Sequence, residues 1–329
     1  MFFFTIRRIL ASVVVLLVSS FLVFALCAAS FDPLSKYYNR NPPPPQSFFD
    51  NLREQLGLND NFFVRYWHWL TGALHGDFGK TINGTPVAGQ LVDRLEVTGR
   101  MIVGAIVIAI VLAIIVGVLG AVRQYRPSDY VTTFIVYILI ALPTFWFAAL
   151  LKEFVAGGIN DLFGSQVLYT IGEQTPGIQL YASGWELWQD RLGHLVLPTV
   201  SLALLSFAAW SRFQRSAMLD VLGADYMRLA RAKGLTYRRT VLKHGLRNAL
   251  IPLTTVVALG IGTLFGGAII TEQVFVWHGM GEYLIQDGIG QNDINVVLGW
   301  LLVSAAFVVV FNLVADVLYA VLDPRIRLA

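Results

Sequence analysis

Six stretches of the chain contain no Asp, Glu, Lys or Arg, and polar segments of very different lengths separate them. Five of these stretches are about 22 residues long, which is enough for a helix to cross roughly 30 Å of hydrocarbon. The fourth has 17 residues, at the short limit. We therefore expect six transmembrane helices in an all-α integral membrane fold, with both termini on one side. The predicted spans are Ile9–Ser30, Met101–Val122, Tyr130–Leu151, Leu195–Ser211, Ala249–Thr271 and Ile294–Ala315.

The longest polar segment, residues 31–98, lies between the first two predicted spans. It contains NPPPP (Asn41–Pro45), which favours extended polyproline geometry. It also contains SFFDNLREQLGLND and NFFVRYWHWLTGALHGDFG, whose apolar residues have helix-like spacing. We interpret these as amphipathic helices at the outer mouth or the membrane interface, with a docking surface for an external partner as the alternative.

A second outer loop is predicted from Lys152 to His194, where Gly and aromatic residues are frequent. The expected organisation therefore has three parts. The first transmembrane helix occupies residues 1–30, the outer segment occupies 31–98, and a five-helix core occupies 99–329, with a cytoplasmic loop at 212–248.

The charged residues indicate the orientation of the chain. With the N-terminus inside, the inner parts hold 15 basic and five acidic residues, and the outer parts hold nine basic and 16 acidic residues. The positive-inside rule then predicts a multi-pass membrane protein with both termini cytoplasmic. The expected location is the plasma (inner) membrane. The inner basic residues are Arg7, Arg8, Arg123, Arg126, nine Lys and Arg residues from Arg212 to Arg247, Arg325 and Arg327.

Composition supports the membrane class, since 56% of the 329 residues are hydrophobic, 14% are charged and the mean hydropathy is +0.64. The pI near 9.0 reflects orientation, and we expect no nucleic-acid partner. A signal peptide is the alternative for Arg7, Arg8 and the run after them, but that run exceeds the usual apolar region of about 7–15 residues. Cys27 is the single cysteine, so no disulfide forms within the chain and its redox role is undetermined.

Candidate chemistry is sparse. GKT (Gly79–Thr81) lacks the first glycine of a phosphate-binding loop because Leu74 stands there, and the five histidines have no metal spacing. We expect no catalytic residue, metal site or cofactor in this chain. The spans also lack the ionisable groups of proton relays, so uphill transport would draw its energy from outside the membrane. A Na⁺ site built from backbone carbonyls stays open.

Two spans carry residues that interrupt or loosen a helix. Pro143 in ALPTFWF should kink the third span, and Phe145 and Trp146 follow it. Gly260 and Gly266 belong to a group of four glycines in the fifth span. Close helix packing explains such residues. The alternative is a bending gate, with these five residues along a translocation pathway.

The segment DYMRLARAKGLTYRRTVLKHGLRNALIP, from Asp225 to Pro252, is densely basic. We expect a helix capped by Asp225 and ended by Gly234 in a left-handed conformation, then a second helix capped by Thr236. A basic element on anionic lipid is one interpretation, and a helix that enters a protein groove is the other. One helix face would carry Tyr226, Leu229, Ala230 and Lys233, and the second helix a basic stripe of Arg239, Lys243 and Arg247.

This segment resembles the coupling loop of ABC-importer permeases, in its dipeptide/oligopeptide form. Arg228, Leu229 and Ala230 stand where the general pattern has E-A-A, and Gly234 matches its glycine. His244, Leu246, Arg247 and the later Pro252 depart from the general I-x-L-P and resemble the peptide-transport branch. The resemblance extends to GDFGKTINGTPVAGQLVDRL, ALPTFW, EQVFVWHGMGEYL and LVADVLYAVLDPRIR, and points to the first of the two permeases in such systems.

The resemblance implies a type I ABC-importer permease fold and half of the translocation pathway of an ATP-driven importer for di- or oligopeptides. It implies a second homologous permease, two cytoplasmic ATPases that bind ATP and Mg²⁺, and an external substrate-binding protein. Import of another small solute, such as a metal chelate or glutathione, and a non-transporting receptor or scaffold are the alternatives. The implied ATPase contacts are Asp225, Tyr226, Arg228, Leu229, Ala230, Arg231, Lys233, Gly234 and Leu235.

Overall fold

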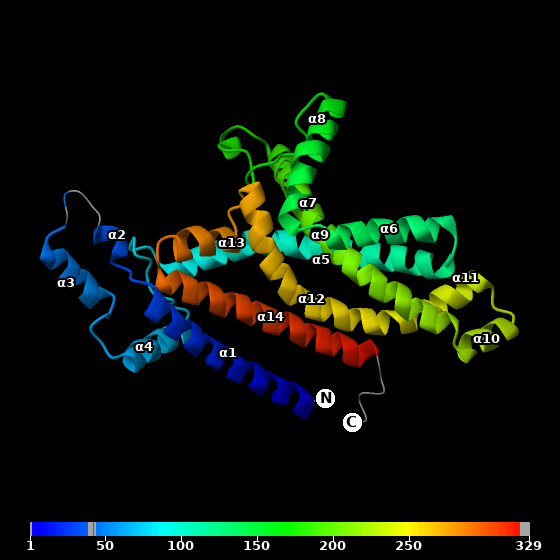
Figure 1. The fold of residues 1–329 in the computed structure, drawn as a ribbon, viewed down its shortest axis with the longest axis horizontal. Coiled ribbons are helices and arrows are strands. Elements are labelled where there is room, and N and C mark those ends of the chain that lie inside the picture. The colour runs from blue at the N-terminus through cyan, green and yellow to red at the C-terminus, as the bar shows by residue number, and fades with distance from the viewer. Residues whose placement is uncertain (1, 39–41, 43, 323–329) are drawn as a thin grey trace. The chain divides into compact units, whose positions relative to one another are not determined.

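The computed structural model describes residues 2–38, 42 and 44–322, and every named element in that part is a helix (Figure 1). Part of the proline-rich stretch and the final basic residues lie outside the described residues. The chain forms two compact units, each with a core of its own. The first unit comprises Met1–Thr98 and His278–Val309, and the second comprises Gly99–Trp277 and Val310–Ala329.

The first unit contains the first helix, the outer segment, and the chain from His278 into the last helix. Its elements are α1 (Phe2–Ser30), α2 (Ser35–Tyr38), α3 (Gln46–Gln55), α4 (Phe62–Leu74), the start of α5 (Val87–Val122), α13 (Met280–Tyr283), η4 (Leu284–Ile289) and much of α14 (Ile294–Leu322).

The outer segment packs onto α1 and α14 through apolar side chains. Phe24 of α1, Trp69 of α4 and Leu298 of α14 belong to one buried cluster, which the helical spacing of NFFVRYWHWL makes possible. The side chain of Asn61 caps α4 by accepting a hydrogen bond from the amide of Phe63 at 3.2 Å. The expectation of helices in this segment is thereby confirmed for α3 and α4.

The loop between α4 and α5 is fixed to the start of α14. Its one described bridge pairs Lys80 with Pro86. The carboxylate of Asp293, 4% exposed, accepts a hydrogen bond from the amide of Ile82 at 2.6 Å and also accepts bonds from the first amides of α14. One buried acid therefore holds a turn and caps a helix.

The second unit contains most of the apolar helices. Its elements are the rest of α5, α6 (Pro127–Ala141), α7 (Thr144–Leu150), η1 (Leu151–Ala156), α8 (Gly157–Phe163), η2 (Ile178–Leu180), α9 (Gly184–Leu222), α10 (Asp225–Ala232), α11 (Tyr237–Thr240), η3 (Val241–Gly245) and α12 (Leu246–Phe275). Within this unit α9 packs along α12 and α6, and α7 packs on both α9 and α12.

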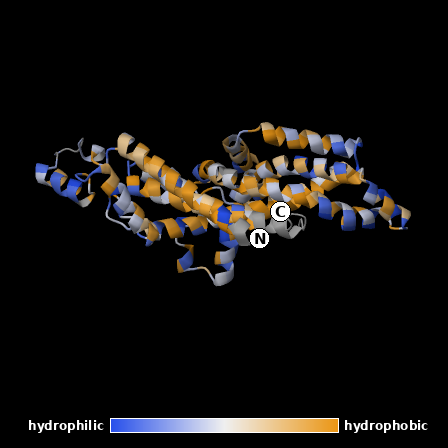
Figure 2. Cartoon of the chain, turned by 90° about the horizontal axis from the view of Figure 1, so that it is seen from below, coloured by the Kyte–Doolittle hydropathy of each residue, from blue (hydrophilic) through white to orange (hydrophobic). Residues whose placement is uncertain are grey.

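Five helices are long and apolar enough to cross a membrane, and a sixth span exists if α6 and α7–α8 are taken together. Those two pieces meet at an angle of 113°. The break is at Leu142 and Pro143, because proline lacks an amide hydrogen and forces the residue before it into an extended conformation. The predicted kink is confirmed. Figure 2 shows hydrophobic residues along the long helices and hydrophilic ones at α3 and α10.

Two predicted boundaries are wrong. The outer loop expected from Lys152 to His194 is helical at both ends, since η1 and α8 continue to Phe163 and α9 begins at Gly184. Gly157 and Gly158 both lie within α8. The short fourth span is the middle of a 39-residue helix, about 58 Å long, that begins at a capping box of Ser183 and Glu186.

Candidate functional site

The candidate site is the connection between α9 and α12, in which α10 is the first helix. Met, Leu, Arg and Ala favour helix in DYMRLARA, and Asp225 and Arg231 complement the helix dipole at the two ends. The predicted cap is wrong by one residue. Ala224 occupies the N-cap position, and the carboxylate of Asp225 instead lies 3.6 Å from the guanidinium of Arg228.

Gly234 ends α10 in the left-handed conformation that its position suggested, with φ of +85°. The amide of Gly234 donates to the carbonyl of Arg231 at 2.9 Å, and the amide of Leu235 donates to that of Ala230 at 3.3 Å. These two bonds form a Schellman motif, which satisfies carbonyls that the helix end would leave without partners. The prediction of a sharp turn at Gly234 is confirmed.

Two methionines fix α10 to the body of the second unit. Met227 is 3% exposed and Met218, on α9, is fully buried. A β-carbon at Gly245 would lie 2.9 Å from the Met218 methyl carbon and 3.2 Å from that of Met227, so a larger residue there would displace the ends of both methionine side chains. Of the residues predicted to share one helix face, Tyr226 and Leu229 are exposed, whereas Ala230 is buried together with Met227.

The outward side of α10 combines apolar and basic groups. Tyr226 and Leu229 are 41% and 56% exposed, although both are large hydrophobic side chains. Arg228, Arg231 and Lys233 are also exposed, and the guanidinium of Arg231 lies over the ring of Tyr237 at 5.7 Å from its centroid. This mixture suits insertion into a groove of another protein better than attachment to lipid headgroups alone.

The second helix of the connection begins with Thr236 at its N-cap position, as predicted, although no side-chain cap bond forms. Arg239, Lys243 and Arg247 are all exposed, so the basic stripe exists. Its spacing is not that of a regular α-helix, because a π-helical segment, Val241–Gly245, lies in the middle. This segment joins directly to α12, so the exposed turn is continuous with a spanning helix.

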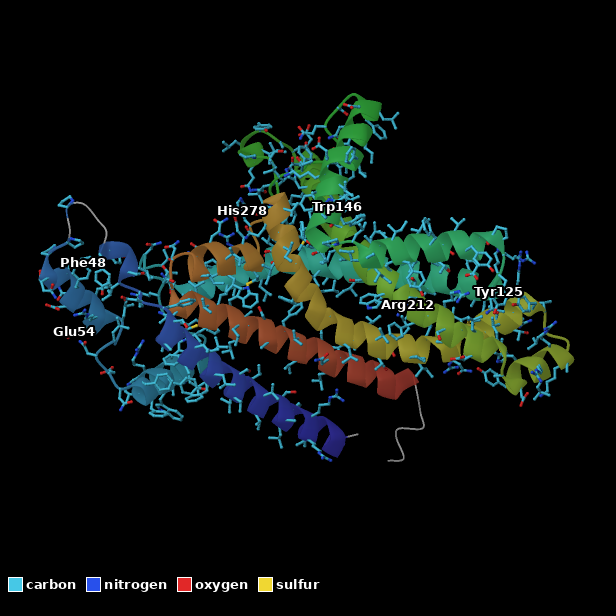
Figure 3. All side chains as sticks on the ribbon, in the orientation of Figure 1. Phe48, Glu54, Tyr125, Trp146, Arg212 and His278 are labelled. Carbon is cyan, nitrogen blue, oxygen red and sulfur yellow. The ribbon has the colours of Figure 1, made fainter. Side chains whose placement is uncertain are left out.

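The five residues proposed for the pathway have different surroundings. Pro143 marks the break between α6 and α7, and Phe145 and Trp146 of α7 are 52% and 47% exposed. Trp146 is labelled in Figure 3. A β-carbon at Gly260 would lie 2.9 Å from the indole nitrogen of Trp210, so this glycine permits close packing of α12 on α9. Gly266 has no heavy atom within 4 Å of that position.

No group of three or more His, Cys, Asp or Glu residues in the described part of the chain is placed to hold a metal ion. Helices that are long and apolar enough to span a membrane, joined by an exposed helix–turn–helix, define the class of multi-pass membrane proteins.

Comparisons with known proteins identify the family. One family model, the binding-protein-dependent transport system inner membrane component, matches residues 93–328. The N-terminal model of the same transport systems matches residues 1–91. The chain belongs to this family of binding-protein-dependent transport permeases. Membership implies that it works in a membrane-embedded complex with ATPase and substrate-binding partners.

Relatives of similar length support the assignment. The oligopeptide transport system permease protein OppB of Mycobacterium tuberculosis is 44% identical, and the alignment covers 98% of each chain. AppB of Bacillus subtilis, another oligopeptide permease, is 38% identical over 98% of each chain. DppB of Escherichia coli, a dipeptide permease, is 35% identical over 84% of each chain.

A solved structure supports the fold. The MetNI methionine ABC transporter, in an inward-facing conformation, contains a chain that matches with a TM-score of 0.55 at 19% identity. The match covers 71% of this protein and 96% of that chain. The expected all-α architecture resembling an ABC-importer permease is confirmed.

Sequence reasoning missed the anchoring residues Met227 and Gly245. The helical spacing in the sequence does not single out Met227, because Met227 and Ala230 have the same i, i+3 spacing as Tyr226 and Leu229. Which pair faces inward depends on where α10 meets α9 and η3, and the local spacing contains no information about that contact.

Proposed function

We propose that this chain is a permease subunit of an ATP-driven importer for di- or oligopeptides and forms half of its translocation pathway. The observation that carries the proposal is the exposed, anchored α10 with its glycine turn, in a chain whose relatives are oligopeptide and dipeptide permeases. The chain itself performs no covalent chemistry in this proposal. ATP and Mg²⁺ are bound by the partner ATPases.

The coupling role follows from how α10 is attached. Tyr226 and Leu229 enter an ATPase groove, while Met227 on the opposite side packs against Gly245 at the start of the path to α12. A push or pull on α10 therefore reaches α9 and α12 through buried contacts, which transmit displacement because protein interiors are close-packed. Arg228, Arg231 and Lys233 add exposed charge that aligns the helix with an acidic groove rim.

The complete complex contains a second, homologous permease, two cytoplasmic ATPases and an external substrate-binding protein. Both termini and the α10–α11 connection face the cytoplasm, and the outer segment, residues 31–98, faces the opposite side. The charge distribution supports this orientation. Pro143, Phe145, Trp146, Gly260 and Gly266 line or gate the pathway, with the break at Pro143 as the flexible point.

Affinity purification of the tagged chain in mild detergent tests the assembly. We expect a second permease and two ATPase subunits to co-purify, and proteoliposomes of this complex to accumulate labelled tripeptide only with ATP and the binding protein. Uptake of a free amino acid in place of peptide would reject the substrate class. Purification of the well-folded chain without any ATPase would reject the coupling role.

A further inference from the structure

A groove of about 350 Å³ lies among α5, α6 and α9 of the second unit, apart from the α10–α11 connection. This volume falls in the range of small-ligand sites, about 300 to 1,000 Å³. One part of its wall is apolar and another carries hydroxyl and guanidinium groups. The residues used below are Val116, Thr133, Val136, Tyr137, Arg212 and Phe213.

A buried ion pair forms one border of the groove. Asp129 is 4% exposed and accepts two hydrogen bonds from the guanidinium of Arg215, at 3.0 Å to Oδ1 and 2.8 Å to Oδ2. The amide of Tyr125 donates to the same carboxylate at 3.1 Å. Gly120 allows this approach, since a β-carbon there would lie 3.2 Å from Arg215 and 3.3 Å from Asp129. The carboxylate therefore accepts three hydrogen bonds from these donors.

Arg212 is the groove arginine that this carboxylate does not neutralise. Its guanidinium lies over the ring of Tyr137, 5.8 Å from the centroid, and no carboxylate within the described residues forms an ion pair with it. Figure 3 labels Arg212 and Tyr125. Two arginines, Arg212 and Arg215, line the groove, Arg215 is paired with Asp129, and no acidic residue is among the lining residues. The groove therefore attracts an anion.

The groove also extends into the apolar part of the chain. Arg212 is the first charged residue after the uncharged stretch of α9, so it marks the boundary of the hydrocarbon. Tyr137 and Phe213 are 53% and 48% exposed, although both are large and aromatic. Val136 lies nine residues into α6, about 13 Å from its start. An occupant with an anionic head and an apolar tail matches both ends.

We propose that this groove binds an anionic phospholipid, with its phosphate at Arg212 and an acyl chain along Val116, Val136 and Phe213. Arginine forms strong paired hydrogen bonds with phosphate oxygens, and basic pockets between spanning helices recognise anionic headgroups. A soluble phosphate would use Arg212 but would leave the aromatic wall open to lipid tails. The proposal does not depend on the transported substrate.

The first test uses the complete transporter in nanodiscs of phosphatidylcholine that contain a trace of photoactivatable phosphatidylglycerol. We expect labelled peptides that include Tyr137 or Phe213. Unlabelled phosphatidylglycerol should suppress the label about five-fold more strongly than phosphatidylcholine. Equal suppression of the labelling by the two lipids would overturn the proposal. Suppression of the labelling by added inorganic phosphate would also overturn it. Labelling of a partner subunit in place of these peptides would show that protein covers the groove.

A pair of variants locates the site. Arg212→Gln should lower phosphatidylglycerol labelling of the groove peptides about five-fold, because one basic group near a membrane surface contributes a factor of that size. Arg239→Gln removes the same charge from another exposed position and should leave this labelling unchanged. Equal losses in both variants would mean that general surface charge attracts the lipid, and the proposed site would be rejected.

Discussion

Gly234→Val perturbs the turn after α10 through the backbone alone. Gly234 has φ of +85°, and no heavy atom lies within 4 Å of the position where a β-carbon would be added. The substitution therefore removes no contact and no charge. Its cost arises because valine is rarely compatible with positive φ, where its β-carbon and branched methyl groups meet the backbone.

The expected cost follows from the left-handed conformation, which is unfavourable for residues with a β-carbon by about 1–2 kcal/mol. Since about 1.4 kcal/mol is a factor of ten, the turn should hold its native geometry roughly five- to thirty-fold less favourably. We expect ATPase affinity and ATP-dependent peptide uptake to fall together by about tenfold, while the chain remains inserted and abundant. ATPase binding to the permease pair and uptake into proteoliposomes measure the two effects.

Two matched variants separate local strain from coupling. Gly84→Val introduces the same strain in the outer segment, since Gly84 also has φ of +85° and no heavy atom within 4 Å of a β-carbon. It should leave ATPase affinity unchanged. Gly234→Asn should retain most activity, because asparagine tolerates the left-handed conformation. Arg239→Ala and Lys243→Ala remove charge without altering the turn and should have smaller effects.

Normal ATPase binding and normal uptake in an abundant Gly234→Val variant would refute the view that this turn is the mechanical link. So would a result in which Gly84→Val lowers ATPase affinity as much as Gly234→Val. If the charge removals reduced activity more than Gly234→Val, attachment of this segment to lipid would be the better explanation.

Three further outcomes are expected. In a Cys27→Ser chain, single cysteines at the exposed positions Ser128 and Thr236 should resist an impermeant thiol reagent in intact cells, and one at the exposed Ser183 should react. Labelling at Thr236 in intact cells would contradict the predicted orientation of the chain. Peptide uptake should survive collapse of the proton gradient while ATP is maintained, and loss of uptake at constant ATP would contradict the energy source. Burial raises the pKa of Asp287 above that of a free carboxyl group. Ionisation of this group therefore destabilises the folded chain as the pH rises from about 4 to the raised pKa, and has no effect below about pH 4. Asp287→Asn should therefore raise the Tm of the complex near pH 7.5 and not near pH 4, and an equal shift at both would refute this cause.

The sequence by itself determined the features that depend on local chain properties. Uncharged stretches located the spans because a bilayer excludes ionised groups over a fixed thickness. Pro143 predicted the broken third span because proline changes the hydrogen bonding and conformation of its own neighbourhood. Gly234 predicted the sharp turn for the same kind of reason, since glycine, which has no β-carbon, adopts a positive φ most readily.

Only the tertiary structure decided which of these local elements meet. Asp129 and Arg215 are 86 residues apart, and Ile82 and Asp293 are 211 residues apart, so neither pair leaves a periodic signal in the sequence. The local spacing of α10 did not show that Met227 and Ala230 face inward, because Met227 lies against Gly245, 18 residues further along the chain. Helical spacing shows which residues share a face of a helix. That face is buried only where it contacts a distant segment, and this contact depends on how the whole chain packs.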